Sequence, residues 1–588
     1  GKVEYEGTLD DLYRDDIDKF IEYNLNDVEI VKALDQKFKL LDLARAVSHL
    51  GRIPYEEVYF SSRYIEGAML VYLRSLGLVA PSKLPTASYD GSEGRFSGAY
   101  VKSPVPGCYD WVFDLDLTSM YPSIIMSLNM SPETKIGKIN GWDAEEFIRG
   151  EDKHYSVEKD KKVIRTFTSG ELKDFFGKNE ISISSNGVLY DLTKKGVIPA
   201  ILEKWFNERV EYRKLAKKYE TEGDLELHGY FNRRQLVQKI LLNSLYGVLG
   251  LTVFRFYDID NAEGTTTTGQ ELIKFTEKVT NSYYNKILKT DEDYCIYTDT
   301  DSVFYSALPL VKNRFPNADV KDEKFMTEQI LDIADEVQSY INKSYNYFSS
   351  RFLNIQGDHR FEIKQEMIAK AAFWVTKKRY GQWIINDGGT PCEKLDVKGL
   401  DIVRSSFPPA FRDFMTKVLK AILAKVPKER IDEFILEFKG NLKNEELDKI
   451  ALPTGVKGIK KYTKKKSKGG FGGSGKGIFT EMMKGAPVHT KASVIYNDLL
   501  RYFKVNKHEA ISNGNKVRWV YLKENPLKID GLAYKGYDDP KQIIDFINQY
   551  VDRDKLFDKA LKKKIQMFYD AMSWDMPVDK KNSIERFF

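Results

Sequence analysis

The stretch VFDLDLTSMYPSII, residues 112–125, carries two carboxylates inside an apolar, β-branched segment of the kind that forms buried strands. A second stretch, YTDTDSV at residues 297–303, repeats the pattern with Asp299 and Asp301. Because residues i and i+2 of a strand share a face, we expect these two aspartates to point the same way. Crowded carboxylates repel each other unless a cation lies between them, and Mg²⁺ prefers carboxylates, waters and phosphates. Two such strands side by side would form a two-metal phosphoryl-transfer site.

Length and composition limit the class of protein. The chain has 588 residues, too many for one core, so we expect three or more subdomains. A hydrophobic fraction of 42% indicates a globular protein, and a net charge of only +5 argues against a uniformly basic nucleic-acid binder. Cys108, Cys295 and Cys392 are far apart, which indicates a reducing compartment and no structural zinc. No apolar run approaches membrane-spanning length, and Gly1 in place of Met indicates a processed, engineered or fragmentary chain.

The order of patterns along the chain places a helical hairpin between the two acidic stretches. Apolar spacing predicts helices from Asp10 to about Leu76, and a loop rich in Pro, Ser and Gly follows to Gly107. From Pro199 we expect a helix, a turn at residues 222–224 and a second helix ending at Gly247. Residues 140–187 give no clear pattern. Beyond about Ser406 the sequence predicts mostly helix, broken by a Lys- and Gly-rich stretch at 457–477.

The second helix of this hairpin carries a polar stripe, since Gln235, Lys239, Asn243 and Tyr246 fall on one face. On the first helix Arg209 and Arg213 are also four residues apart. Three converging cations need an anion, and a triphosphate fits. For either helix alone, an ordinary amphipathic hairpin with a solvated basic face explains the pattern. The position between two acidic stretches favours the anion site.

Three motifs in this order resemble those of family B DNA polymerases. DLTSMYPSII (Asp116–Ile125) resembles motif A, KILLNSLYG (Lys239–Gly247) motif B, and YTDTDS (Tyr297–Ser302) motif C. FSGAYV (Phe96–Val101) and KKRY (Lys377–Tyr380) also match family segments. The resemblance covers nearly the whole chain and is closest to the replicative polymerases of large tailed, myovirus-type bacteriophages, in an N-terminally truncated or split form.

The resemblance implies an α+β multidomain fold with the shape of a right hand. An antiparallel palm sheet, helical fingers and a mainly helical thumb would follow a helical remnant of a 3′–5′ exonuclease domain. The implied boundaries are 1–80 for the exonuclease remnant, 81–110 for a connector, 111–196 and 251–400 for the palm, 197–250 for the fingers, 401–580 for the thumb and 581–588 for a clamp-binding tail.

The same resemblance assigns the metal and nucleotide sites. Asp116 and Asp301 would bridge two Mg²⁺ ions, for which Mn²⁺ can substitute. The backbone carbonyl of Leu117 would complete the coordination shell of a metal ion. Asp299 would lie nearby and adjust the properties of the metals. Tyr121 would be the steric gate against ribonucleotides. The implied nucleotide-binding residues are Ser119, Met120, Tyr121, Arg209, Arg213, Lys239 and Asn243.

The resemblance also assigns contacts with DNA. Tyr246 and Gly247 would lie against the nascent base pair, and Lys378, Arg379 and Tyr380 would contact the primer-template. Three features depart from the family pattern: Asp114 is an extra carboxylate on the face of Asp116, Met120 replaces the usual Leu at equal volume, and the fingers hairpin is short.

Three weaker signals lie outside these motifs. EYNLND (Glu22–Asp27) resembles the last of three exonuclease motifs, with Tyr23 and Asp27 matching, although a helix with an exposed Asp explains it nearly as well. We expect no exonuclease activity from this chain alone, because the earlier carboxylates are missing.

The run Gly470–Lys476 has a phosphate-loop spacing, but Gly477 stands where Ser or Thr is required. With Lys464, Lys465, Lys466 and Lys468 it indicates a basic loop on duplex DNA or a solvated linker.

The C-terminal sequence resembles a clamp-binding peptide, with Ile584, Phe587 and Phe588 as the expected contacts, and a tail folded onto the thumb is the alternative. The predicted function is template-directed DNA synthesis by a phage replicative polymerase in the cytoplasm of an infected bacterial host. Expected partners are primer-template DNA, deoxynucleoside triphosphates, a sliding clamp and a separate N-terminal exonuclease polypeptide, and no membrane. The alternatives are a polymerase-like binding protein without catalysis, or one part of a split polymerase and exonuclease.

Overall fold

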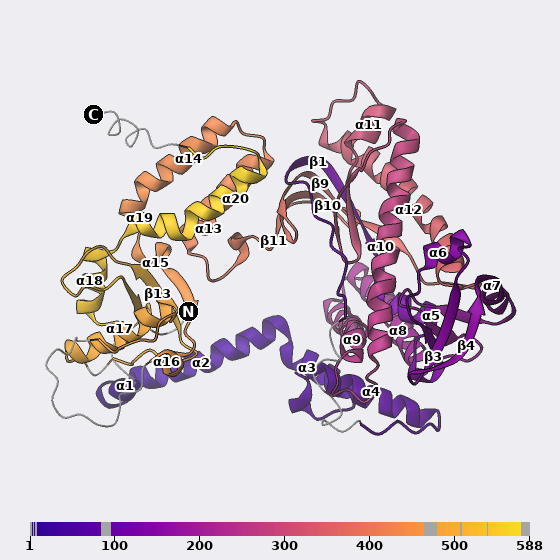
Figure 1. The fold of residues 1–588 in the computed structure, drawn as a ribbon. Coiled ribbons are helices and arrows are strands. Elements are labelled where there is room, and N and C mark those ends of the chain that lie inside the picture. The colour runs from indigo at the N-terminus through magenta and orange to yellow at the C-terminus, as the bar shows by residue number, and fades with distance from the viewer. Residues whose placement is uncertain are drawn as a thin grey trace.

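A computed structural model describes residues 3, 5, 9–83, 96–463, 479–505, 508–537 and 539–577, and Figure 1 shows their arrangement. One body contains a central sheet and its long helices, and a second body holds the C-terminal residues in orange and yellow. Helix α2 (Ile17–Phe38) crosses between the two bodies. The mixed helix and strand content with antiparallel sheets agrees with the predicted α+β class.

The central sheet is antiparallel, with six strands in the order β11-β10-β9-β1-β8-β7. The strands are β1 (Gly107–Leu117), β7 (Cys295–Asp299), β8 (Ser302–Ser306), β9 (Ile363–Thr376), β10 (Arg379–Asp387) and β11 (Thr390–Lys398). Strand β1 pairs with β8 so that Asp116 lies opposite Ser302. The prediction that the two acidic stretches lie side by side is therefore confirmed.

Two long helices pack on one face of this sheet. They are α10 (Ile259–Leu288) and α12 (Glu323–Phe352), with the short α11 (Leu308–Arg314) between them in the chain. Phe113 and Leu115 of β1 pack in the same apolar cluster as these helices, whereas Val112 packs in a cluster on the other face. Because side chains alternate along a strand, Asp114 and Asp116 lie on the face of Val112, away from the long helices.

The predicted helical hairpin is present as α8 (Val197–Thr221) and α9 (Leu225–Leu249). Gly223 adopts a left-handed φ of 76° in the turn, and the Asp224 side chain caps α9 by accepting from the Leu227 N–H at 3.0 Å. Helix α5 (Met120–Leu128), which follows β1 directly, packs against both helices. The hairpin is therefore held against the end of the strand that carries Asp116.

Residues 140–187, which show no clear pattern in the sequence, lie within a second antiparallel sheet that spans residues 135–191. Its order is β4-β3-β2-β6-β5, and it carries helices α6 (Ala144–Arg149) and α7 (Ser169–Lys178). The strands are β2 (Lys135–Ile139), β3 (His154–Lys159), β4 (Lys162–Thr168), β5 (Ile181–Ile183) and β6 (Val188–Asp191). The alternation of Tyr155 and Val157 with polar residues is a sequence signal for β3. In the structure Asp160 and Lys161 both have positive φ and form the two-residue turn from β3 to β4.

The N-terminal region is helical, as predicted. It contains α1 (Leu9–Asp15), α2, α3 (Leu40–Gly51) and α4 (Ser61–Ser75). Helix α4 packs against α3 and α9, which joins this region to the hairpin.

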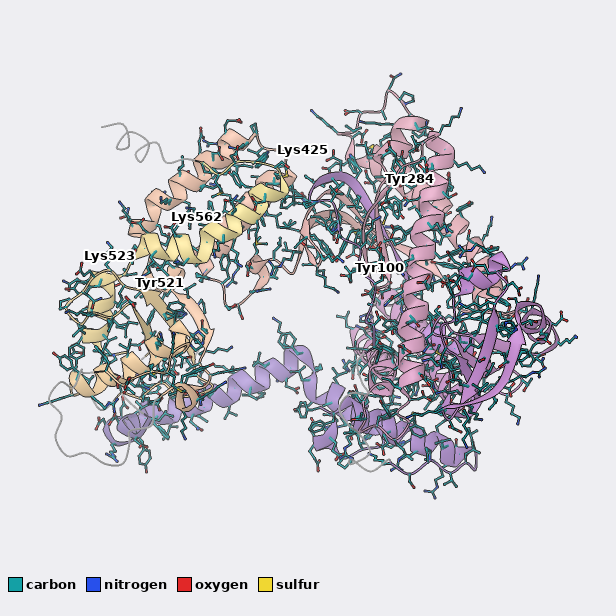
Figure 2. The ribbon with its side chains drawn as sticks, in the orientation of Figure 1. Tyr100, Tyr284, Lys425, Tyr521, Lys523 and Lys562 are labelled. Atoms are coloured by element: carbon teal, nitrogen blue, oxygen red, sulfur yellow. The ribbon has the colours of Figure 1, made fainter. Side chains whose placement is uncertain are left out.

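The C-terminal body combines helices with a small sheet. Its helices are α13 (Pro409–Leu423), α14 (Lys428–Asn441), α15 (Leu447–Ile450), α16 (Ile459–Tyr462), α17 (Val488–Tyr502), α18 (Lys541–Tyr550), α19 (Arg553–Leu556) and α20 (Lys563–Ala571), with a π-helical segment Phe557–Lys562. The strands β12 (Leu452–Gly455), β13 (Lys516–Tyr521) and β14 (Gly531–Tyr534) were not predicted. Lys425, labelled in Figure 2, joins this body to β1 through an ion pair of 2.5 Å with Asp110.

Candidate active site

The turn between β7 and β8 corrects the prediction for Asp299 and Asp301. Asp299 ends β7, and Thr300 and Asp301 form a two-residue connection in which Thr300 has a left-handed φ of 63°. A hairpin reverses the chain at this point, so the i, i+2 geometry of a continuous strand does not apply. The prediction that both carboxylates share one strand face is therefore wrong, because Asp301 lies in the turn and not on a strand.

Asp116 and Asp301 are neighbours across the β1–β8 pairing. The N–H of Leu117 donates to the carbonyl of Asp301 at 2.9 Å, which fixes the hairpin turn beside the end of β1. Burial, then the Asp301 and Glu366 carboxylates, raise the pKa of Asp116 to about 8. Burial is also the largest cause of the raised pKa of Asp301, with Asp299 and Glu366 adding to it. The excess of negative charge at this point favours a cation.

Asp299 is engaged by three side chains. Its carboxylate accepts from the Tyr297 hydroxyl at 3.1 Å, from the Thr300 hydroxyl at 3.1 Å and from the Lys378 ammonium at 2.8 Å. Tyr297 also accepts from the N–H of Lys378 at 2.9 Å. Asp299 therefore fastens the β9–β10 turn to the β7–β8 turn.

Asp114 has a structural role in the sheet. It is buried, and its Oδ1 accepts from the N–H of Met367 at 2.7 Å and from the N–H of Glu366 at 3.3 Å. The β1–β9 register shifts at this point. The carboxylate therefore accepts hydrogen bonds from backbone N–H groups that the irregular strand pairing leaves without a backbone acceptor. Burial raises the pKa of Asp114 to about 7, and its charge adds to the raised pKa of Asp116.

Glu366 is a site residue that the sequence analysis missed. It lies on β9, its side chain is exposed, and its charge contributes to the raised pKa values of Asp114, Asp116 and Asp301. The segment around it resembles no motif quoted above. Only the pairing of β9 with β1 reveals its position, because the carboxylate is distant from Asp116 in sequence.

The residues after Asp116 turn from strand to helix. Ser119 has a left-handed φ of 50° and precedes α5, and Met120 and Tyr121 form its first turn. Gly269 of α10 lies so close that a Cβ there would be 3.1 Å from Met120 Cε and 3.2 Å from Tyr121 Cε1. The rings of Tyr121 and Tyr246 are 4.2 Å apart between centroids. The predicted steric gate therefore touches the predicted base-pair residue.

The hairpin presents its predicted polar stripe. Lys239 and Asn243 are exposed, whereas Val237, Leu241 and Leu245 are buried. Arg209 donates to Gln235 across the two helices at 3.5 Å, and burial, then Arg213, lower the pKa of Arg209. The charge of Lys239 lowers the pKa of Asp116, so Lys239 lies near this carboxylate. Gly247 is exposed one residue after Tyr246.

The β9–β10 turn carries the predicted DNA contacts. Lys378 has a left-handed φ of 60° and its side chain is 63% exposed. Arg379 contacts Met567 of the C-terminal body at 3.8 Å. Tyr380 differs from the expectation of a DNA contact, because it is buried and its ring stacks on Trp374 at 5.5 Å. The buried ring of Tyr380 therefore stabilises the β9–β10 turn.

Tyr23 and Asp27 lie four residues apart on α2. The pKa of Tyr23 is raised by burial and by its hydrogen bond to Asp27. Three predicted features lie outside the described residues. They are the basic residues Lys464, Lys465, Lys466 and Lys468, the run Gly470–Gly477, and the tail residues Ile584, Phe587 and Phe588. Among the residues that the structure describes, no three His, Cys, Asp or Glu side chains form a metal cluster, and no helix is long and apolar enough to cross a bilayer.

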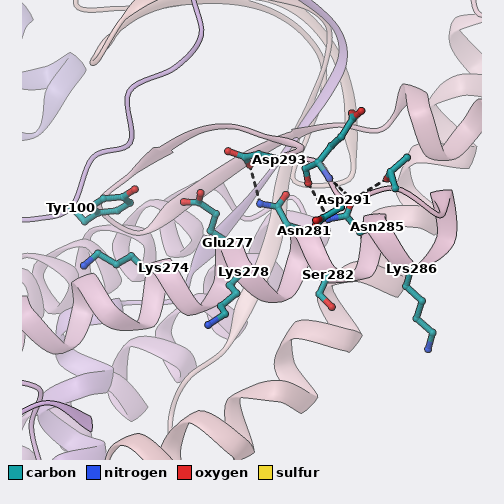
Figure 3. Close-up of a pocket in the computed structure, with 12 residues that line it drawn as sticks. Tyr100, Lys274, Glu277, Lys278, Asn281, Ser282, Asn285, Lys286, Asp291 and Asp293 are labelled. Carbon is teal, nitrogen blue, oxygen red and sulfur yellow. Dashed lines mark hydrogen bonds between the residues drawn. The ribbon is translucent and has the colours of Figure 1, made fainter. Parts of the chain in front are cut away.

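A large cavity lies away from these carboxylates. Figure 3 shows it along α10, with Tyr100 and the loop of Asp291 and Asp293 on its other side, and its volume is about 870 Å³. The Asn281 amide donates to Asp293 at 2.9 Å across it. Its lining includes no predicted site residue, so we assign the active site to the carboxylates and not to this cavity.

Comparison with known proteins agrees with this geometry. The sequence model of DNA polymerase family B matches residues 55–570. The DNA-directed DNA polymerases of Enterobacteria phage T4 and Escherichia phage RB69 are 26% and 25% identical to this chain, and each alignment covers 100% of the chain and 67% of the relative. A DNA polymerase of Pyrococcus glycovorans is 26% identical over 74% of the chain and 46% of its own length. The chain belongs to DNA polymerase family B.

Proposed function

We propose that this chain is a template-directed DNA polymerase that adds deoxynucleotides to a primer 3′-OH, with a replicative role in a bacteriophage. The observation that carries the proposal is that Asp116 and Asp301 are neighbours where β1 pairs with β8. Lys239 and the Tyr121–Tyr246 ring pair lie beside them. The phage relatives that cover the whole chain are DNA-directed DNA polymerases.

The elements of the fold correspond to the parts of a right-hand polymerase in this proposal. We assign the palm to the central sheet with α10 and α12, the fingers to the α8–α9 hairpin and the thumb to the C-terminal body. Helices α1 to α4 correspond to the exonuclease remnant and its connection. The sheet inserted at residues 135–191 lies within the segment predicted as palm, so the palm prediction covers two structural units.

The donor set fits a divalent cation. Asp116 and Asp301 are partly buried carboxylates with raised pKa values, and the backbone of Leu117 is held between them. Proteins satisfy Mg²⁺ with one or two carboxylates, water and substrate phosphates, so these residues would hold two Mg²⁺ ions together with the triphosphate. The bound metals would lower the pKa of the primer hydroxyl and neutralise charge on the leaving pyrophosphate.

The residues of the chain perform the remaining steps. Arg209, Arg213 and Lys239 bind and orient the triphosphate by charge. Tyr121 fills the space of a ribose 2′-OH, and the ring of Tyr246 supports the base pair. Closure of the hairpin toward the sheet excludes water before the 3′-OH attacks the α-phosphate and pyrophosphate leaves. Base pairing with the template determines which deoxynucleotide is added.

The proposed partners are primer-template DNA, deoxynucleoside triphosphates, a sliding clamp at the C-terminal tail and a separate exonuclease polypeptide. The proposed location is the cytoplasm of an infected bacterial host. The second candidate, a primer-template binding protein without catalysis, lacks support from the site, because binding alone gives no chemical need for the Asp116–Asp301 pair.

The test is extension of a recessed primer with Mg²⁺ and four deoxynucleotides. We expect Asp301→Ala to abolish extension and to retain primer-template binding. Asp335→Ala, which removes an exposed carboxylate on α12, is the matched control and should extend like the wild type. Tight binding by the wild type without extension would favour the binding protein.

A further inference from the structure

Helix α4 packs against the half of α9 that carries the predicted nucleotide and base-pair residues. The hydroxyls of Tyr64 on α4 and Ser244 on α9 are hydrogen-bonded at 2.7 Å. Ser244 directly follows Asn243 in the chain and precedes Tyr246 by two positions. The contact with α4 is therefore made at the segment of α9 to which both of these residues belong.

The Tyr64 side chain is held firmly on the other side, where α4 crosses α3. Tyr64 is only 6% exposed. A Cβ built on Gly51 of α3 would lie 2.5 Å from the Cβ of Tyr64, and one built on Gly67 of α4 would clash with the carbonyl oxygen of Gly51. The two helices therefore cross with their backbones in close contact. Because a close-packed interior resists displacement, the ring of Tyr64 is fixed relative to α3.

A second polar contact joins α4 to the segment that follows α9. The Glu66 carboxylate, which is buried, accepts from Arg255 Nε at 3.0 Å. Arg255 lies between the end of α9 and the start of α10, and it also donates to the carbonyl of Pro81 at 2.8 Å. Tyr64 and Glu66 are two residues apart on α4. Helix α4 therefore holds α9 both at Ser244 and just beyond its last residue.

The segment of α9 held in this way reaches the candidate active site. The ring of Tyr246 lies 4.2 Å from the ring of Tyr121 between centroids. Tyr121 lies in the first turn of α5, shortly after the strand that carries Asp116. A shift of α9 at Ser244 would therefore move Tyr246 relative to Tyr121, where the nucleotide is proposed to bind.

We propose that Tyr64 is a positioning residue for the incoming deoxynucleotide. Its hydroxyl, acting through Ser244, sets the position of Asn243 and Tyr246 against the bound nucleotide. The inference rests on the proposed function, because it concerns the nucleotide pocket of a polymerase. A hydrogen bond with a merely structural role would instead change the stability of the fold and leave the affinity for the nucleotide unchanged.

The variants remove single hydroxyl groups. Tyr64→Phe keeps the buried ring, Ser244→Ala removes the partner, and the double variant completes a double-mutant cycle. Tyr72→Phe is the matched control, because it removes a hydroxyl from the same helix at a ring that lies beside Lys204 of α8.

Two assays are applied to every variant. Steady-state addition of one correct deoxynucleotide gives kcat and KM. Binding of the same deoxynucleotide to the chain on a primer-template that ends in a dideoxynucleotide gives Kd without any catalysis. Thermal unfolding of each variant reports the stability of the fold.

We expect Tyr64→Phe to raise KM and Kd about fivefold at nearly unchanged kcat, because it removes a contact that supports nucleotide binding. A fivefold change corresponds to about 1 kcal/mol, the usual size of one neutral hydrogen bond. Ser244→Ala should also raise both constants, and the double variant should be no worse than the weaker-binding single variant, because the two hydroxyls act as a pair. Tyr72→Phe should behave like the wild type.

Any of three results would overturn the proposal. They are unchanged KM and Kd in Tyr64→Phe, effects of the two single substitutions that add in the double variant, and a lower thermal midpoint and kcat at unchanged nucleotide affinity. Absence of extension by the wild type would count against the polymerase function instead. The Kd values need no catalysis, so they would still decide the role of Tyr64.

Discussion

Gly399 tests how the turn at Lys378, a proposed DNA contact, is held. Gly399 follows β11 with a left-handed φ of 65°, and a Cβ built there would lie 1.9 Å from the carbonyl oxygen of Lys378. Real Cβ atoms keep at least 3.0 Å from such an atom, so Gly399→Ala must push the turn by about 1 Å. This displacement would separate Lys378 from Asp299 and Tyr297, which it contacts at 2.8 and 2.9 Å.

The magnitude follows from two costs. A left-handed alanine costs about 1–2 kcal/mol, and overpacking adds about 1–3 kcal/mol. We therefore expect Gly399→Ala to lower the free energy of unfolding by roughly 2–5 kcal/mol and to weaken primer-template binding by about tenfold. Gly389→Ala is the matched control, because Gly389 also has a positive φ, 81°, with no atom within 4 Å of the added Cβ.

The assay combines urea unfolding with anisotropy of a labelled primer-template. The control should lose only about 1–2 kcal/mol and bind DNA like the wild type. Equal losses of stability in the two alanine variants, or unchanged DNA binding by Gly399→Ala, would refute the reasoning that close packing positions Lys378.

Three further predictions concern single side chains. Burial alone would raise the pKa of Asp260, but Lys135 and Lys138, at 2.6 and 3.0 Å, hold it below its usual value. Its stabilisation is present at neutral pH and is lost as the pH falls below about 4, so Asp260→Asn should cost about 1–3 kcal/mol in urea unfolding at pH 7 and much less near pH 2. Lys239→Gln should raise KM for deoxynucleotides roughly tenfold in steady-state extension, with stability changed by less than about 0.5 kcal/mol because Lys239 is exposed. Tyr121→Val should increase ribonucleotide incorporation at least about tenfold in single-turnover extension, and unchanged discrimination would reject its role as steric gate.

Patterns set by local periodicity were predictable from the sequence. The hairpin α8–α9 and the N-terminal helices follow from apolar spacing and turn residues, and the adjacency of the two acidic stretches followed from their chemistry. The inserted sheet was missed, because β5 and β6 have only three and four residues and give no periodic signal.

Details of the site depend on tertiary pairing. The turn at Thr300 interrupts what the sequence suggested as one strand, since alternation alone does not distinguish a strand from a two-residue hairpin. The structural role of Asp114 and the contribution of Glu366 depend on the register between β1 and β9. The burial of Tyr380 depends on its stacking with Trp374.

The pairing of Asp116 with Ser302 also sets when the active site can exist during synthesis. These residues belong to neighbouring strands, yet the inserted sheet, the α8–α9 hairpin and α10 lie between them in the chain. At synthesis rates of about 5–20 residues per second, the ribosome needs roughly 10–40 s to reach residue 302 after residue 116. Long-range strand pairing is slow as well as late. A nascent chain therefore exposes the apolar edge of β1, without its carboxylate partner, until just over half of these 588 residues have been made.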